Sequence, residues 1–236
     1  MSLKKPGKSS PLSASSEYYP AFLKIAGKQC VIIGGGKVAE RKCSALLRAG
    51  ARVTVISPGI TKTLQRYRGK KLLKHVSRHY RKGDIRSAFA VIVATDSEAT
   101  NRQVVTDAAG AGVLLNVVDN PSLCTFIAPS ILTRGPLTIA ISTGGVSPAM
   151  ARTIRRELER MYGTEFSGYL RFVKEIRGRA MSEISDKRER ERFLKGLASE
   201  EMIGLLRRQG FREARKTALK RWQDLRRSLC GGRFTH

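Results

Sequence analysis

A glycine-rich turn is the first segment of this chain whose residue types and spacing could bind a ligand. From Gly34 onward the chain reads Gly-Gly-Gly-Lys-Val-Ala, which fits Gly-x-Gly-x-x-Ala between a short apolar run and a helical pattern. Gly34 would permit a tight bend, Gly36 would let a pyrophosphate approach the backbone, and Ala39 would allow close packing. The N–H groups of Lys37 and Val38 would lie at the positive end of the helix dipole. The pattern predicts a dinucleotide site, and the alternative is a glycine turn without a ligand.

The second strand of a dinucleotide site usually ends at an acidic residue that holds the ribose. Here that strand ends at Ser57, Pro58 and Gly59, with no acid. Ser57 or the adjacent backbone would have to bind the ribose diol. The site residues therefore leave the choice between NAD and NADP open.

Polar residues also follow the next two predicted strands of the same unit. Thr95 and Asp96 follow one strand, whereas Asn116 and Asp119 come at the end of the other. Because ligands bind outside the carboxyl ends of parallel strands, these residues should face the same crevice. We expect Thr95 to contact the cofactor, Asn116 to contact the substrate, and Asp96 to cap the following helix. Asp119 lies where nicotinamide would meet a substrate, or is a turn-former before Asn-Pro.

A second turn joins a strand-like run to a helix start at Ser142, Thr143 and Gly144. Its hydroxyls and N–H groups suit a carboxylate or phosphate, and the alternative is a capped helix with no ligand. His75 and His79 are expected on an exposed strand edge instead of in a metal site. The cysteines have no Cys-x-x-Cys spacing, so we expect reduced thiols and no zinc site or disulfide framework. They are Cys30, Cys43, Cys124 and Cys230.

Alternating strand and helix patterns must position these residues. The predicted strands are residues 29–33, 52–57, 73–79, 89–95 and 114–118, and the predicted helices between them are 37–49, 60–68 and 98–109. Strands separated by helices of this length argue for a parallel sheet covered on both faces, which is a Rossmann-type α/β fold.

The alternation of predicted strands and helices ends after Asp119. Two strand-like runs, residues 125–132 and 137–143, predict a hairpin. Helical patterns follow over residues 149–161, 165–181, 187–197, 201–208 and 211–225. We predict a disordered tail over residues 1–17, a nucleotide-binding domain over 18–119, a small β segment over 120–146 and a helical C-terminal domain over 147–236.

The composition is strongly basic. The 236 residues carry a formal charge of +26, and residues 62–86 hold ten Lys or Arg with one acid. Such a run is either a solvated face or a surface for a polyanion. Aromatic residues make up only 6% of the chain and are not interleaved with the run, which argues against nucleic acid as a partner. No window reaches the roughly 18 apolar residues of a membrane span, and the first 16 residues contain no leader-like apolar run, which predicts a cytoplasmic protein with no membrane partner.

Seven ordered sequence blocks resemble the siroheme synthase family of precorrin-2 dehydrogenases and sirohydrochlorin ferrochelatases. The similarity is to the stand-alone enzyme and to the N-terminal part of the multifunctional synthase. The blocks read YPAFL (19–23), VIIGGGKVAERK (31–42), GARVTV (50–55), ATD (94–96), NVVD (116–119), FIAPS (126–130) and STGGVSP (142–148).

The resemblance implies NAD⁺-dependent oxidation of precorrin-2 to sirohydrochlorin and, in many members, insertion of Fe²⁺ as a substrate to give siroheme. It makes Asp119 the principal catalytic residue, and it places cofactor contacts at Lys37, Val38, Pro58 and Gly59. It also implies a homodimer built through the β segment and the C-terminal helices.

Two alternatives stay open at this stage. One is a dehydrogenase that leaves metal insertion to a separate chelatase. The other is a non-catalytic NAD-binding regulatory or nucleic-acid-binding protein. Precorrin-2 is an octacarboxylate, which suits a basic crevice, although a charge of +26 exceeds what one such substrate needs.

Overall fold

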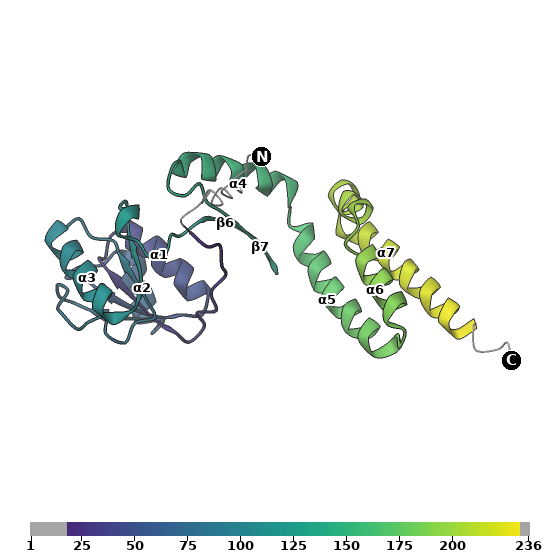
Figure 1. Cartoon of the computed structure of the whole chain (residues 1–236), viewed down its shortest axis with the longest axis horizontal. Helices are drawn as coiled ribbons and strands as arrows, with labels where there is room; N and C mark the ends of the chain where they lie inside the picture. Colours follow the sequence, from purple (N-terminus) through teal and green to yellow (C-terminus); the bar gives the residue numbers. More distant parts are fainter. Residues whose placement is uncertain (1–17, 232–236) are drawn as a thin grey trace, which may run out of the picture. The chain divides into compact units, whose positions relative to one another are not determined.

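The computed structural model describes residues 18–231. The chain divides into two compact units, residues 1–128 and residues 129–236 (Figure 1). The tail predicted over residues 1–17 lies outside the described residues. Each unit is described by itself.

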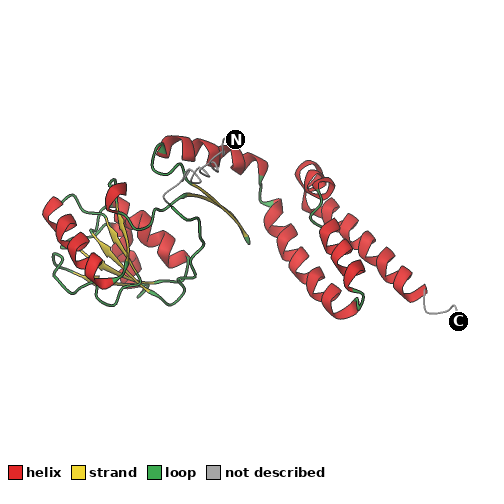
Figure 2. Ribbon diagram, viewed as in Figure 1, coloured by secondary structure: helices red, strands yellow, loops and turns green. Residues whose placement is uncertain are grey.

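A five-stranded parallel sheet forms the centre of the first unit (Figure 2). The strand order is β3-β2-β1-β4-β5. Both the parallel sheet and its helical connections confirm the predicted Rossmann-type fold. The strands are β1 (Gln29–Ile33), β2 (Arg52–Ile56), β3 (Leu73–Val76), β4 (Ala90–Val93) and β5 (Leu114–Val117).

Helices cover both faces of this sheet. They are α1 (Lys37–Arg48), α2 (Lys62–Gly69) and α3 (Glu98–Ala111). Since successive side chains of a strand point to opposite faces, each strand serves two cores. Ile32 packs in one core with residues of α1 and α2, and Ile33 packs in the other with residues of α3. The near-continuous apolar strands follow from burial on both faces.

The helix α3 begins at Glu98 as predicted, but its N-cap lies one residue later than the predicted cap. Ser97 is its N-cap, because the Ser97 hydroxyl accepts a hydrogen bond from the Thr100 N–H at 3.3 Å. The prediction that Asp96 caps this helix is therefore wrong. Asp96 is exposed in the preceding turn.

The second unit begins with an antiparallel hairpin, β6 (Ser130–Arg134) and β7 (Leu137–Ile141). The hairpin was predicted, but its first strand starts five residues later than residue 125. Residues near Thr125 pair with β5 of the first unit instead, since the Thr125 N–H donates to the Leu115 carbonyl at 2.9 Å. The Leu115 N–H donates in turn to the Thr125 hydroxyl at 2.7 Å.

Four helices follow the hairpin in the described part of the second unit. They are α4 (Pro148–Met161), α5 (Glu165–Glu183), α6 (Lys187–Gly196) and α7 (Glu200–Gly231). The last three share an aromatic-rich core that includes Phe172, Ile176 and Trp222. The two C-terminal helices predicted from the sequence form one element that is kinked at Gly210, where φ is 78° and ψ is −176°. Among the described residues, none of the helices combines the length and apolarity that a membrane span requires.

Candidate functional site

The glycine turn between β1 and α1 uses its three glycines in three different ways. A Cβ atom on Gly34, whose φ is +112°, would clash with the Ala94 carbonyl oxygen, and a Cβ atom on Gly35 would clash with the Gly59 carbonyl oxygen. A Cβ atom on Gly36 would meet nothing within 4 Å. Gly34 and Gly35 are therefore locked against the neighbouring loops, whereas the backbone at Gly36 faces open space that a ligand can enter.

The first turn of α1 presents unpaired donors beside this open space. Gly36 is the N-cap and makes no side-chain cap hydrogen bond. The first N–H groups of the helix, including those of Lys37 and Val38, have no partner within the helix. Ala39 is fully buried, as close packing on the sheet requires. A helix start with free N–H groups and no side chain in the way fits a pyrophosphate.

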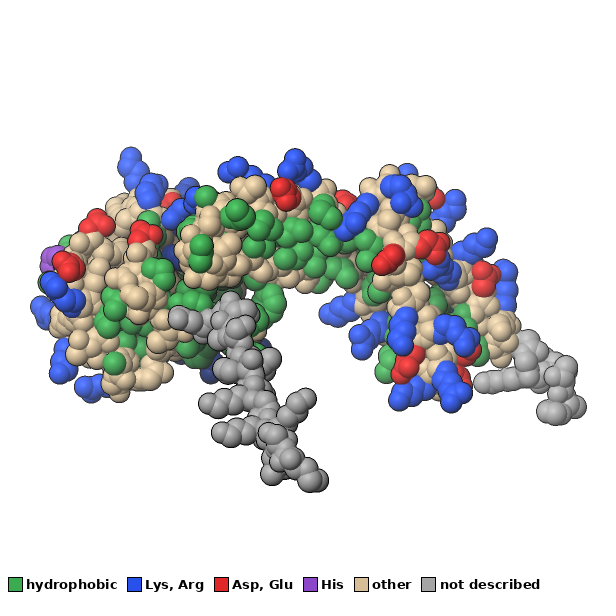
Figure 3. Space-filling model, turned by 45° about the horizontal axis from the view of Figure 1, so that its top comes forward, with side chains coloured by type: hydrophobic (Ala, Val, Ile, Leu, Met, Phe, Trp, Pro, Cys, Tyr) green, Lys and Arg blue, Asp and Glu red, His purple; other side chains and the backbone are tan. Residues whose placement is uncertain are grey.

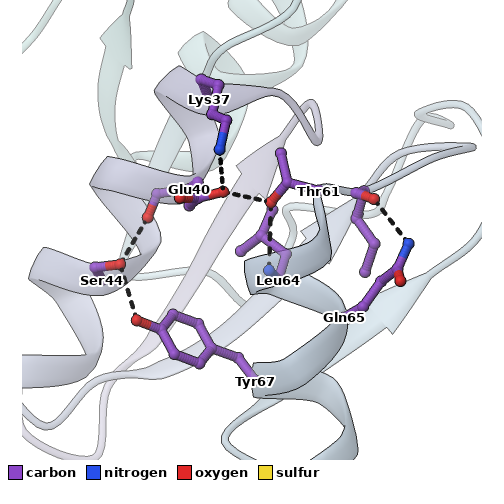
Figure 4. A network of polar contacts seen from close by, with 8 residues as sticks. Lys37, Glu40, Ser44, Thr61, Leu64, Gln65 and Tyr67 are labelled. Atoms are coloured by element: carbon purple, nitrogen blue, oxygen red, sulfur yellow. Dashed lines mark hydrogen bonds and ion pairs between the residues drawn. The ribbon is translucent and has the colours of Figure 1, made fainter.

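A polar network holds the glycine turn to the start of α2 (Figure 4). The Thr61 hydroxyl donates to Glu40 Oε2 at 2.6 Å and accepts from the Leu64 N–H at 3.3 Å, so it also caps α2. The Thr61 N–H donates to the Gly35 carbonyl at 3.1 Å. The Thr61 hydrogen bond holds the pKa of the Glu40 carboxyl below its usual value, with a smaller contribution from Lys37. These contacts set the geometry of the turn before any ligand binds.

The loop after β2 is held from the edge strand. His75 Nε2 lies 2.9 Å from the Ser57 carbonyl oxygen, and the Ser77 hydroxyl donates to the Pro58 carbonyl at 3.2 Å. Because a carbonyl only accepts, the Nε2 atom of His75 must carry the proton. The predicted exposed strand edge is met only in part: His75 lies on the edge strand β3 but is half-buried, and His79 is exposed but lies beyond the end of β3.

A cavity at the carboxyl ends of β1, β2 and β4 brings four predicted cofactor residues together. Those four are Gly34, Ser57, Pro58 and Thr95. Five more residues complete the lining, and the sequence analysis did not assign them: Ile33, Ile56, His79, Tyr80 and Thr100. The Tyr80 hydroxyl donates to Asp107 on α3 at 2.7 Å, which fixes one wall of the cavity. The cavity lies at the carboxyl edge of the sheet, which is where open α/β sheets bind their ligands.

Asp119 is exposed in the turn that follows β5, and its φ is +61°. The Asn120 N–H closes the turn on the Val117 carbonyl at 3.3 Å. Aspartate is one of the few residues other than glycine that tolerate a positive φ, because its short polar side chain can interact locally. The strand order places β5 next to β4, so this carboxylate ends a strand of the same sheet edge as the cavity.

The Asn116 side chain lies inside the unit instead of in open solvent. It is 6% exposed, and its Nδ2 donates to the Phe126 carbonyl at 3.1 Å. Its Oδ1 has no hydrogen-bond partner among the described residues. Asn116 therefore supports the end of β5, and its predicted contact with the substrate stays a prediction.

The predicted anion turn belongs to the second unit, between β7 and α4. The Ser142 hydroxyl accepts from the Gly144 N–H at 3.1 Å, and the Thr143 hydroxyl accepts from the Ser147 N–H at 3.1 Å. Ser147 caps α4 by accepting from the Met150 N–H at 3.2 Å. Several donors of this turn are thus used locally, and binding of a carboxylate or phosphate there stays a prediction.

No group of three or more His, Cys, Asp or Glu side chains that could hold a metal ion occurs within residues 18–231. Cys30 and Cys43 are buried, and burial raises the pKa of the Cys43 thiol to about 11. Burial also raises the pKa of the Cys30 thiol.

Comparison with known proteins agrees with this geometry. A family described as putative NAD(P)-binding matches residues 21–130, and one described as sirohaem biosynthesis protein central matches residues 134–161. The siroheme synthase of Nitrosomonas eutropha is 41% identical over 181 residues, which are 75% of this chain and 37% of that protein. The siroheme synthase of Thioalkalivibrio sulfidiphilus is 34% identical over 213 residues, which are 89% of this chain and 44% of that protein.

A solved structure, SirC, precorrin-2 dehydrogenase, superimposes with a TM-score of 0.72 at 25% identity, covering 86% of this chain and all of the other. The chain spans about two fifths of the length of the curated synthases it matches. The two family matches together occupy most of residues 21–161; the first range includes the glycine turn and Asp119, and the second includes the turn at Ser142. Over most of its length the chain is a homologue of siroheme synthases, and its fold is that of SirC, precorrin-2 dehydrogenase.

Proposed function

We propose that this chain oxidises precorrin-2 to sirohydrochlorin with NAD⁺ as the hydride acceptor. One observation carries the proposal: the open backbone at Gly36 and the exposed carboxylate of Asp119 both lie at the carboxyl edge of one parallel sheet. That edge is where open α/β sheets bind their ligands. The similarity to SirC, precorrin-2 dehydrogenase, supports the choice of substrate.

The chain's own residues divide the work of binding the dinucleotide. The N–H groups of Lys37 and Val38 receive the pyrophosphate at the start of α1. Ser57, Pro58 and Gly59 contact the ribose, and Thr95 contacts the cofactor from the end of β4. The nicotinamide ring of bound NAD⁺ would accept the hydride.

Asp119 acts as the general base. Oxidation of precorrin-2 removes one hydride and one proton, and the Asp119 carboxylate accepts that proton. The products are sirohydrochlorin, NADH and the proton. In a second step, we expect the same carboxylate to take pyrrole N–H protons as Fe²⁺, a substrate, enters sirohydrochlorin to give siroheme.

The homodimer is also proposed, through the β6–β7 hairpin and the adjoining helix α4. A two-stranded hairpin is marginal on its own, and large apolar side chains stay exposed on these elements. Figure 3 shows hydrophobic side chains gathered over this part of the second unit. The large apolar residues exposed on the hairpin, on α4 and in the turn between them include Ile131 (50% exposed), Val146 (89%) and Met150 (57%). A cytoplasmic location stays a prediction from the sequence.

An anaerobic assay with precorrin-2 and NAD⁺ tests the function. We expect NADH formation by the wild type and near-complete loss in Asp119→Asn, which keeps the shape of the side chain and tolerates the positive φ. The matched control is Glu98→Gln, an exposed acid on α3 that should retain full activity. Unchanged turnover in Asp119→Asn would exclude Asp119 as the base. Addition of Fe²⁺ after the first step then measures siroheme formation against the non-enzymatic rate.

A further inference from the structure

In addition to its own Asn120–Val117 hydrogen bond, the turn that carries Asp119 contacts the sulfur atom of Cys124. Cys124 follows the short 3₁₀ helix at Pro121–Leu123, and its chain doubles back toward the end of β5. Cys124 Sγ lies 3.3 Å from the Val117 carbonyl oxygen and 3.3 Å from the Asn120 carbonyl oxygen. These carbonyls belong to the first and last residues of the turn. The thiol hydrogen can serve either one.

The same sulfur atom also accepts hydrogen bonds. The Val117 N–H donates to it at 3.2 Å, and Asn116 Nδ2 lies 3.6 Å from it. The sulfur therefore contacts the backbone before and after Asp119 and the buried amide beneath it. Asp119 itself contributes a positive φ, which the isolated turn does not favour.

The segment that presents Cys124 is itself anchored to the sheet. The Thr125 N–H and hydroxyl pair with both backbone groups of Leu115, and the Phe126 carbonyl accepts from Asn116. The Cys124 N–H donates to the Pro121 carbonyl at 3.0 Å. The sulfur thus links a rigid part of the sheet to a strained turn.

We propose that Cys124 is a positioning residue for Asp119, whose thiol holds the Val117–Asn120 turn so that the carboxylate stands at the carboxyl end of β5. The proposal rests on the proposed function, in which Asp119 is the base. A cysteine suits this position because it both donates and accepts. Alanine would remove every one of these contacts, and serine would keep both capacities with a shorter reach.

The test compares Cys124→Ala, Cys124→Ser and Cys30→Ala in the anaerobic NADH assay. Cys30 is the matched control, because it is buried near the start of β1, away from the carboxyl edge. In Cys124→Ala, we expect kcat to fall about ten- to a hundredfold, since misplacing a catalytic group by about 1 Å has effects of this size. The dissociation constant of NADH, measured by fluorescence, should not change. Cys124→Ser should recover most of kcat, and Cys30→Ala should retain it.

Two outcomes would overturn the proposal. One is a kcat of Cys124→Ala within twofold of the wild type. The other is an equal loss of kcat in Cys30→Ala, which would show a general effect of core disruption. If Cys124→Ala does not fold, as judged by circular dichroism, Cys124→Thr replaces it and should lose kcat, because its methyl group crowds the turn.

A double-variant cycle separates this proposal from the proposed function. If Cys124 acts through Asp119, Cys124→Ala should cause no further loss of activity in the Asp119→Asn background. A full further loss would show that Cys124 acts independently, and that would contradict the positioning role. Full activity of Asp119→Asn alone would instead refute the proposed base, whatever Cys124 does.

Discussion

Gly35 and Gly36 are neighbours in one turn but are glycines for different reasons. Gly35 is enclosed by the loop after β2, and Gly36 faces the space that the ligand should enter. We predict that Gly35→Ala lowers the free energy of unfolding by about 1–3 kcal/mol through overpacking. Gly36→Ala should leave unfolding nearly unchanged and weaken NADH binding at least about tenfold, because its methyl group occupies the path of the pyrophosphate.

Urea unfolding measures the stability of Gly35→Ala and Gly36→Ala, and fluorescence titration measures their affinity for NADH. Equal stability of the two variants would show that the contact between Gly35 and Gly59 does not constrain the turn. Wild-type NADH affinity in Gly36→Ala would remove Gly36 from the proposed site.

A second residue-scale prediction concerns the loop after β3. Arg78 donates two hydrogen bonds to the Asp84 carboxylate, at 2.7 and 2.8 Å, and holds the pKa of Asp84 below its ordinary value. Because the pKa is lowered in the folded state, the stabilisation is present above the unfolded value of about 3.9 and is lost as the pH falls through the folded value. Asp84→Asn should therefore lower stability at pH 7 by up to about 1 kcal/mol.

The same variant should lose less stability than the wild type when the pH is lowered from about 5 to 2. Urea unfolding of the first unit across this range measures the difference, with Glu98→Gln as an exposed control. Parallel stability curves for the wild type and Asp84→Asn would contradict the assigned role of this ion pair.

At the scale of elements, the kink in α7 depends on one backbone conformation. Gly210 combines φ 78° with ψ −176°, a region that is almost closed to other residues. Gly210→Ala should lower the free energy of unfolding of the second unit by about 1–3 kcal/mol. Gly178 is exposed within α5 with open space around it, so Gly178→Ala should raise that free energy by about 0.5–1 kcal/mol. Thermal unfolding followed by circular dichroism should show a lower midpoint temperature for Gly210→Ala and a higher one for Gly178→Ala. Shifts of the same sign in both variants would contradict this account.

The hairpin makes a second prediction at this scale. If β6 and β7 form the dimer interface, Ile131→Glu should convert the dimer to a monomer, because a charge would enter an apolar contact. Leu72→Glu is the control, since Leu72 has the same 50% exposure but lies in the first unit. Sedimentation equilibrium measures the mass of each variant. If Ile131→Glu is still a dimer, the interface lies elsewhere. If the wild type is a monomer, the proposed homodimer is wrong.

For the whole molecule, the charge of +26 should act on an acidic substrate at a distance. Lys and Arg side chains, drawn in blue, are spread widely over the face that Figure 3 shows. We predict that the KM for precorrin-2 rises at least about tenfold between 0.05 and 0.3 M salt, because screening shortens the reach of the field. The KM for NAD⁺, which has a smaller charge, should change less. Steady-state kinetics at several salt concentrations measures the two KM values. An equal salt dependence of the KM for precorrin-2 and the KM for NAD⁺ would contradict steering by the surface charge.

The sequence by itself determined the features that depend on neighbouring residues. The apolar strand before Gly34, the helix pattern after Gly36 and the alternation along residues 29–118 predicted the nucleotide fold, because strand and helix periodicity are local properties. The position of Asp119 at a strand end followed from the same pattern. The break near Gly210 was also visible in the sequence.

Only the tertiary structure decided which distant groups meet. Four features depend on contacts between separate segments. They are the close approach of Gly35 to Gly59, the His75 hydrogen bond to the loop after β2, the burial of Asn116 and the contacts of Cys124 Sγ with the Asp119 turn. A lone cysteine or histidine carries no periodic pattern that would reveal such a partner. The pairing of Thr125 with β5 likewise shortened the predicted hairpin, because backbone groups there found partners in the sheet before they could form the next strand.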